Sequence, residues 1–132
     1  MQGNKIVKIL KIVPAGAYNG LIWFLSSIQL PVNIASCDKF AHLLEYSIMG
    51  FLLSFMFAVT RKNLNPTAQY CMFFGVFAGG MDEIHQYFVP GRTCDFFDFL
   101  TDITGIAAGI FTWLLVTKLL SYIKLNLFTK KV

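Results

Sequence analysis

The chain has 132 residues, of which 56% are hydrophobic and 14% are charged, with a net charge of +4. Its mean hydropathy is +0.62. Soluble domains carry about 25% charged residues, and so short a chain cannot bury this much apolar surface in a soluble core. The composition therefore predicts one domain, residues 1–132, in a lipid bilayer. The basic residues lie near the chain ends and in one loop, which is typical of membrane topology and excludes a nucleic-acid partner.

The first apolar stretch follows three lysines, and residues 12–37 contain no charge. About 20 apolar residues cross the hydrocarbon core of a bilayer, so residues 12–30 are predicted to form a transmembrane helix. Pro14 would lie in its first turn, where proline is tolerated. The alternative is a secretory signal that ends in a cleavage box at residues 34–37. Residues 31–33 separate that box from the apolar run, which favours the transmembrane helix.

Three more helices are predicted from their boundary signals. Asp38, in N-cap position, opens a helix over residues 38–60, which ends at Arg61 and Lys62. Asn65-Pro66 is a turn signal before a third helix over residues 67–87, and Pro90-Gly91 is another before a fourth over residues 94–123. The predicted fold is an all-α membrane protein, a four-helix transmembrane bundle.

The distribution of basic residues predicts the orientation of this bundle. Nine of the eleven Lys and Arg lie in the N-terminal segment, in the 61–62 loop, or from Lys118 to the end of the chain. Basic loops stay on the cytoplasmic side, so both termini are expected to be cytoplasmic. All seven acidic residues and both histidines then fall at the outer end of the bundle, together with Lys39 and Arg92.

The uncharged stretches of the second and fourth helices, residues 46–60 and 103–117, are short. Each covers only about 22 Å of a hydrocarbon core that is about 30 Å thick. The turns that bear His42, Glu45, Asp98 and Asp102 are therefore expected to enter the outer leaflet. Ionisable groups at that depth must face the bundle interior or a wet cavity, and they are functional candidates.

Polar residues recur at helical spacing on three helices: Asp38, His42, Glu45 and Tyr46; Asp82, Glu83 and Gln86; and Asp95, Asp98 and Asp102. Two glycine pairs, Gly75-x-x-x-Gly79 and Gly105-x-x-x-Gly109, continue the stripes of the third and fourth helices. Small residues at this spacing let helices approach closely. The pattern predicts that the three polar stripes converge on one pocket.

These residues resemble the pattern of a known family. The motifs are Asp38-Lys39-x-x-His42-x-x-x-Tyr46-x-x-x-Gly50, Asp82-Glu83-x-x-Gln86, Pro90-Gly91-Arg92-Thr93, and Asp98 followed by Gly105 and Gly109. Together they are similar to the VanZ-like membrane proteins, a family named for a protein linked to teicoplanin resistance. The resemblance implies a multi-pass protein of the bacterial cell membrane and envelope. The sequence differs at Asp102, where the family usually has Asn, and the extra acid adds negative charge.

One hypothesis is a metal-assisted hydrolase or transferase that acts on a phosphate-bearing membrane lipid or a lipid-linked envelope precursor. Its catalytic candidates are His42, Asp82, Glu83 and Asp98. Its substrate-binding candidates are Lys39, Tyr46, Gln86 and Arg92. The candidate ligands of a divalent metal are Asp38, His42, Glu83 and Asp98. Oxygen-rich ligand sets suit Mg or Mn, while a histidine also allows Zn or Fe.

Two other functions remain open. A non-catalytic protein would use the same pocket to bind a cell-wall precursor, the antibiotic or an envelope partner. Proton or ion transport is disfavoured, because a path across the membrane requires polar groups in the inner halves of the helices, which are glycine and aliphatic.

Several polar residues also have purely structural interpretations. Asp38 and Asp95 are suited to helix starts, where acids are stabilising. His85 lies off the polar face of its helix. Arg92 is either an internal counter-ion or a clamp for an anionic ligand, and we favour the clamp because of its planar fork. Whether Cys37 and Cys94 form a disulfide is left open.

Overall fold

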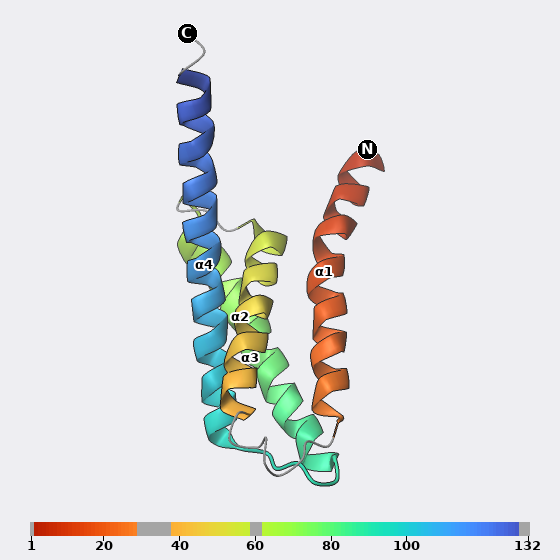
Figure 1. Cartoon of the computed structure of the whole chain (residues 1–132). Coiled ribbons are helices and arrows are strands. Elements are labelled where there is room, and N and C mark those ends of the chain that lie inside the picture. Colours follow the sequence, from red (N-terminus) through yellow and green to blue (C-terminus); the bar gives the residue numbers. More distant parts are fainter. Residues whose placement is uncertain (1, 29–37, 59–61, 130–132) are drawn as a thin grey trace.

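The computed structural model describes residues 2–28, 38–58 and 62–129, and within these ranges the chain forms four helices and no strand. They are α1 (Gln2–Ser26), α2 (Asp38–Phe57), α3 (Leu64–Phe88) and α4 (Phe96–Thr129), arranged as a bundle (Figure 1). The predicted all-α, four-helix fold is confirmed. The start of α1 and the end of α4 lie at one end of the bundle, and the start of α2, the end of α3 and the start of α4 lie at the other (Figure 1).

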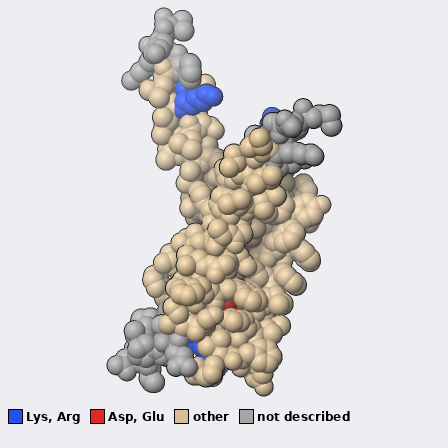
Figure 2. Space-filling model, turned by 90° about the vertical axis from the view of Figure 1, so that its right-hand side faces the viewer, with Lys and Arg blue, Asp and Glu red and all other residues tan. Residues whose placement is uncertain are grey.

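Three of the described helices are long and apolar enough to cross a membrane: Ile9–Ser26, Asp38–Phe57 and Phe96–Leu127. The remaining helix, α3, has 25 residues, but Asp82, Glu83 and Gln86 near its end lower its hydropathy. Figure 2 shows a side of the molecule that is almost entirely uncharged between its two ends. This wide apolar belt is what a bilayer-spanning bundle presents to lipid.

Several helix boundaries differ from those predicted. Helix α1 begins at Gln2 instead of residue 12, because no helix-breaking residue precedes Pro14 apart from Gly3, and Pro14 therefore lies inside the helix. Helix α3 begins at Leu64, so that Pro66 lies in its first turn, where proline does not break a helix. Helix α4 continues to Thr129, six residues beyond its predicted end. The predicted boundaries at residues 30 and 60 lie outside the described residues.

Helices α2 and α4 share the largest interface of the bundle, and glycine makes this close approach possible. A Cβ atom on Gly105 would lie 2.8 Å from the carbonyl oxygen of Leu43, and one on Gly109 would lie 2.6 Å from the backbone nitrogen of Phe51. On α2, Gly50 faces the backbone of Ile106 in the same way. The predicted glycine seam of the fourth helix is therefore confirmed.

Helix α3 packs on the same face of α4 through the other glycine pair. Gly75 lies against the side chain of Ile106, and a Cβ on Gly79 would lie 3.0 Å from Oδ2 of Asp102. Ile106 is thus buried between α2 and α3, near the centre of the apolar core. This packing sets the depth at which Asp102 faces α3.

Helix α1 packs against α2 and α3, on the side away from α4 (Figure 1). The ring of Trp23 stacks on His85 of α3 with the ring centroids 4.8 Å apart. The Nε2 atom of His85 also lies 2.9 Å from the hydroxyl of Ser27. These two contacts fasten the end of α1 to the end of α3.

Candidate functional site

The first two turns of α2, the last two turns of α3 and the first two turns of α4 meet at the end of the bundle opposite the chain termini. All of the site residues predicted from the sequence lie in or beside this cluster. Their catalytic, substrate-binding and metal-binding roles stay predictions. The buried polar members are His42, Asp82, Glu83, Gln86, Asp98 and Asp102. Because α2, α3 and α4 approach closely through glycine, their polar stripes face one another across a short distance.

His42 is at the centre of the cluster. Its Nδ1 atom lies 2.9 Å from Oδ1 of Asp102, and its Nε2 atom lies 3.4 Å from Nε2 of Gln86. The Gln86 amide also donates to Oδ2 of Asp82 at 3.1 Å. A neutral imidazole that is protonated on Nδ1 satisfies both of its contacts, donating to Asp102 and accepting from Gln86. The carboxylate of Asp102 thereby fixes the orientation of the ring.

Tyr46 lies one turn below His42 on α2, and the two rings are nearly parallel with their centroids 6.4 Å apart. Tyr46 is buried, and its hydroxyl has no hydrogen-bond partner among the described residues. The hydroxyl is therefore available to a ligand that reaches the floor of the cluster.

Both cations of the cluster are paired with carboxylates. Nη1 of Arg92 donates to the two oxygens of Asp38 at 2.9 and 3.0 Å. Nζ of Lys39 donates to Asp98 at 2.7 Å and to Asp95 at 2.9 Å. These contacts correspond to the counter-ion interpretation of Arg92. Its Nε atom, however, is buried without a partner in the described part of the chain, so the planar fork is only partly used.

Three carboxylate oxygens in the cluster are buried and have no partner within the described ranges: Oδ1 of Asp82, Oε1 of Glu83 and Oδ2 of Asp102. More than about 90% of buried polar groups in native structures have a hydrogen-bond partner. Three such oxygens in one cluster therefore make it a place where a bound cation, water or ligand would be stabilised.

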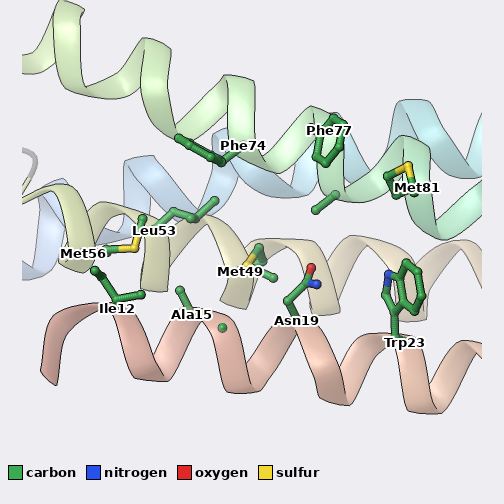
Figure 3. A pocket seen from close by; sticks show the side chains of 12 residues that line it. Ile12, Ala15, Asn19, Trp23, Met49, Leu53, Met56, Phe74, Phe77 and Met81 are labelled. Atoms are coloured by element: carbon green, nitrogen blue, oxygen red, sulfur yellow. The ribbon is translucent and has the colours of Figure 1, made fainter. Parts of the chain in front are cut away.

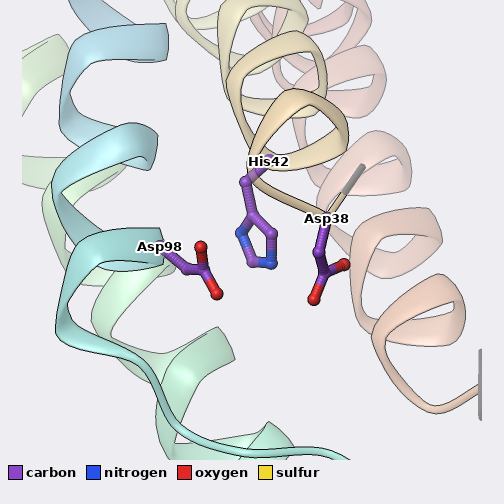
Figure 4. Close-up of side chains that lie close together, drawn as sticks. All are labelled: Asp38, His42 and Asp98. Atoms are coloured by element: carbon purple, nitrogen blue, oxygen red, sulfur yellow. The ribbon is translucent and has the colours of Figure 1, made fainter. Parts of the chain in front are cut away.

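Two sets of side chains have ligand atoms within 4.8 Å of one another, as a bound metal requires: Asp38, His42 and Asp98, and His42, Glu83 and Asp102. Figure 4 shows the first set, in which the imidazole lies between the two carboxylates. The metal-ligand set predicted from the sequence is thus divided between two groups that share His42.

The second set is the better cation site. In the first set, Asp38 and Asp98 already pair with Arg92 and Lys39. In the second set all three residues are buried, and two unpartnered oxygens belong to it. With Nδ1 bonded to Asp102, His42 would bind a cation through Nε2, in exchange for its long contact with Gln86. A carboxylate-rich site with one imidazole accepts Mg²⁺ or Mn²⁺, and also Zn²⁺ or Fe²⁺.

The sequence marked Asp102 as a functional candidate by its depth and its place on the polar stripe, but assigned it no catalytic, substrate-binding or metal-ligand role. Its position one turn after Asp98, and one turn before the close-packed glycine seam, was the available signal. Its side chain is completely buried, and it contacts the central histidine. We therefore include it in the candidate site.

The rim of the cluster is formed by the loop before α4. Asp95 caps α4 by accepting from the backbone of Phe97 at 2.8 Å, as its structural interpretation predicted. The neighbouring Lys39 ammonium holds the pKa of Asp95 below its ordinary value. The backbone nitrogen of Asp95 donates to Oε2 of Glu83 at 2.8 Å, so this loop positions one of the candidate metal ligands.

Cys94 is exposed and carries a free thiol. Loss of some hydration, and the nearby Glu83 carboxylate, raise the pKa of this thiol above its ordinary value. A thiol with a raised pKa is a poor nucleophile at neutral pH. Its predicted disulfide partner, Cys37, lies outside the described residues, so that pairing stays untested.

The comparison with known proteins identifies the family. A family model described as VanZ/LLP1 matches residues 2–117, a range that includes the whole of the polar cluster. No curated protein matches the sequence. No solved structure matches it either. Because the match covers most of the 132 residues, the chain belongs to the VanZ/LLP1 family.

Proposed function

We propose that this protein is a metal-assisted hydrolase or transferase that acts on the phosphate group of an envelope lipid or a lipid-linked cell-wall precursor. One observation carries the proposal: the buried set of His42, Glu83 and Asp102 retains two unpartnered carboxylate oxygens. Membership of the VanZ/LLP1 family supplies the link to glycopeptide resistance, which is consistent with action on a component of the cell envelope.

The charge of the cluster supports a cation. Four of its carboxylates are buried, those of Asp82, Glu83, Asp98 and Asp102. Lys39 pairs with only one of these four, Arg92 pairs with Asp38 instead, and His42 contacts Asp102, so Asp82 and Glu83 are the two with no basic partner in the described structure. Buried carboxylates without a counter-charge are strongly unfavourable. A divalent cation bound to the second ligand set would offset this cost and supply a Lewis acid for chemistry at phosphorus.

The phosphate would be bound by Arg92 and Lys39 at the mouth of the cluster. Arg92 uses one nitrogen for Asp38, and its buried Nε is without a partner in the described structure. A guanidinium that retains free donors suits a phosphate, which it can contact with two parallel hydrogen bonds. In this proposal Asp82 is the general base, a role supported by its unpartnered Oδ1.

Location in the bacterial cell membrane, with the site facing outside and both termini cytoplasmic, is part of the same proposal. Three described helices are long and apolar enough to cross a membrane. Lysines gather toward the chain ends, and the start of α1 and the end of α4 lie opposite the acidic cluster (Figure 1). Basic segments favour the cytoplasmic side, which supports an outward-facing cluster.

The test is a phosphate-release assay on the full chain in vesicles, with polyprenyl diphosphate and phosphatidic acid as substrates. We expect release that requires Mg²⁺ or Mn²⁺ and is abolished by chelation. It should fall by at least about 10- to 100-fold in Glu83→Gln and Asp102→Asn, since even the outer-shell partners of a metal contribute this much. Asp95→Asn, a carboxylate change at the rim, is the matched control and should retain most of the activity. Activity that survives chelation would refute metal assistance.

A non-catalytic binding function is the second candidate, and one observation favours it. Both cations are already paired with carboxylates. Ion pairs of this kind hold the side chains of the site in place, and a site that only binds a ligand needs nothing more. A protein that binds one of these lipids in the presence of Mg²⁺ but releases no phosphate would support this candidate and refute the enzyme.

A further inference from the structure

An apolar groove lies between α1, α2 and α3, with an open volume of about 360 Å³. Figure 3 shows that side chains of all three helices point into it. Its lining includes Ile12 and Trp23 of α1, Met49 and Leu53 of α2, and Phe77 and Met81 of α3. Ligand pockets in proteins have volumes of about 300–1,000 Å³, so the groove is large enough to hold a ligand.

The groove lies at the depth of the hydrocarbon core. On α1 it extends from Ile12 to Trp23, within the candidate membrane span Ile9–Ser26. At 1.5 Å per residue this stretch is about 16 Å long. Asn19 provides the single amide in an otherwise apolar lining. Water has too few polar partners in such a groove to be a stable occupant, so the occupant must be apolar.

The width of the groove excludes another helix. Even when all of the empty space around it is included, the volume is about 850 Å³. Over a length of about 16 Å this gives a mean cross-section of roughly 50 Å², whereas a helix with a diameter of about 10 Å occupies roughly 80 Å². A helix from a second copy of the chain therefore does not fit inside the groove. A single hydrocarbon chain is long, narrow and apolar, as the groove requires.

Along α2 and α3, one end of the groove lies within one helical turn of residues of the polar cluster. Met81, which lines the groove, directly precedes Asp82 and Glu83 of the cluster, and Met49 follows Tyr46 by one turn of α2. A molecule with an apolar tail in the groove would thus have its other end beside the acidic and basic side chains. Membrane lipids with a phosphate headgroup have this chemistry.

We propose that the groove between α1, α2 and α3 binds one hydrocarbon chain of a phosphate-bearing membrane lipid, with its headgroup at the polar cluster. The headgroup half of this statement rests on the proposed function, whereas the chain-binding half rests on the groove alone. The protein would then take its lipid laterally from the bilayer, through the open side of the groove.

Two glycines of α1 provide a matched pair of variants. Gly16 lines the groove and Gly20 is not among its lining residues, yet a Cβ atom on either would have no neighbouring atom within 4 Å. Gly16→Phe should therefore fill the groove without a backbone clash, and Gly20→Phe should leave it open. Both variants are expected to keep the thermal stability of the wild type, which a detergent melt would verify.

The experiment uses the full chain in phosphatidylglycerol vesicles that contain a phosphatidylglycerol with a diazirine near the end of one acyl chain. After illumination, labelled residues are located by mass spectrometry. We expect labelling of Leu53 and Met56, which line the end of the groove away from the polar cluster, reduced at least fivefold by Gly16→Phe and less than twofold by Gly20→Phe. Labelling of Phe111, an exposed residue of α4, should be equal in all three proteins, because it reports contact with bulk lipid.

Labelling of Leu53 and Met56 that Gly16→Phe leaves unchanged would overturn the proposal. A change from dimer to monomer in Gly16→Phe, detected by crosslinking in the same vesicles, would overturn it in favour of a second copy. The outcome is independent of the proposed function, because no metal or turnover is needed. If Glu83→Gln abolishes phosphate release and leaves the labelling intact, both proposals are supported. If the wild-type protein releases no phosphate and the labelling persists, only the enzymatic function fails.

Discussion

Removal of Arg92 separates the two roles that its position allows. The contact with Asp38 is made by one nitrogen to both carboxylate oxygens, at 2.9 and 3.0 Å. A lysine ammonium can make the same point contact, but it lacks the planar fork that binds a phosphate with two hydrogen bonds. Arg92→Ala and Arg92→Lys therefore give different combinations of stability and activity.

The magnitude follows from the burial of the pair. An exposed ion pair contributes about 0.2–1 kcal/mol, whereas removing one partner of a buried pair costs about 3–5 kcal/mol. The exposed fractions of the side chains are 10% for Arg92 and 23% for Asp38, so we expect Arg92→Ala to cost about 2 kcal/mol, between these limits. This corresponds to a fall in the melting temperature of roughly 5–10 °C.

The assay combines thermal unfolding in detergent with phosphate release in vesicles. Arg92→Lys should restore most of the stability that Arg92→Ala loses, and should leave phosphate release strongly impaired. Lys39→Ala is the control, because the Lys39 side chain is 54% exposed and its loss should lower the melting temperature less. If Arg92→Lys restores both stability and activity, the phosphate-clamp role is wrong and Arg92 is a counter-ion only.

Three further predictions concern the bundle. Gly109→Ala should destabilise the protein by about 1–3 kcal/mol, because the added Cβ meets the α2 backbone. The control Gly20→Ala, whose Cβ meets open space, should be neutral or stabilising. Equal melting temperatures of the two variants would contradict the close α2–α4 packing. His85→Ala removes the stacking on Trp23 and should increase proteolysis near the end of α1 with cation binding unchanged; unaltered protection would show that this contact does not hold α1. A reporter fused to the C-terminus should be cytoplasmic, and a tag in the 89–94 loop should be labelled from outside; the reverse would put the cluster at the inner face.

The helices and the inward polar stripes were predictable, because they depend on local periodicity. Asp38, His42 and Tyr46 share one face of a helix whatever its partners are, and the glycines Gly105 and Gly109 mark the face that packs closely. The convergence of these faces followed from the limited ways in which a short bundle can bury them. The start of α1 was missed because the N-terminal lysines were interpreted as the boundary of the membrane span and not as part of the helix.

The pairing of charges could not be derived from the sequence, because it depends on side-chain distances between helices. The sequence does not indicate that Arg92 contacts Asp38, or that Asp102 and not Asp38 joins His42 and Glu83. The groove could not be predicted from the sequence either, since its lining comes from three helices and depends on how far α1 lies from α3. Such features arise from tertiary packing, which periodicity alone does not determine.

The most direct test of the central claim is the number of divalent cations that the purified chain binds. Equilibrium dialysis against Mn²⁺, read by elemental analysis, should give one ion per chain for the wild type and for the rim control Asp95→Asn. Glu83→Gln and Asp102→Asn should each weaken that binding by at least about tenfold, as expected for loss of a carboxylate ligand or its partner. A wild-type chain that binds no cation, or variants that bind it as tightly as the wild type, would contradict the metal centre formed by His42, Glu83 and Asp102.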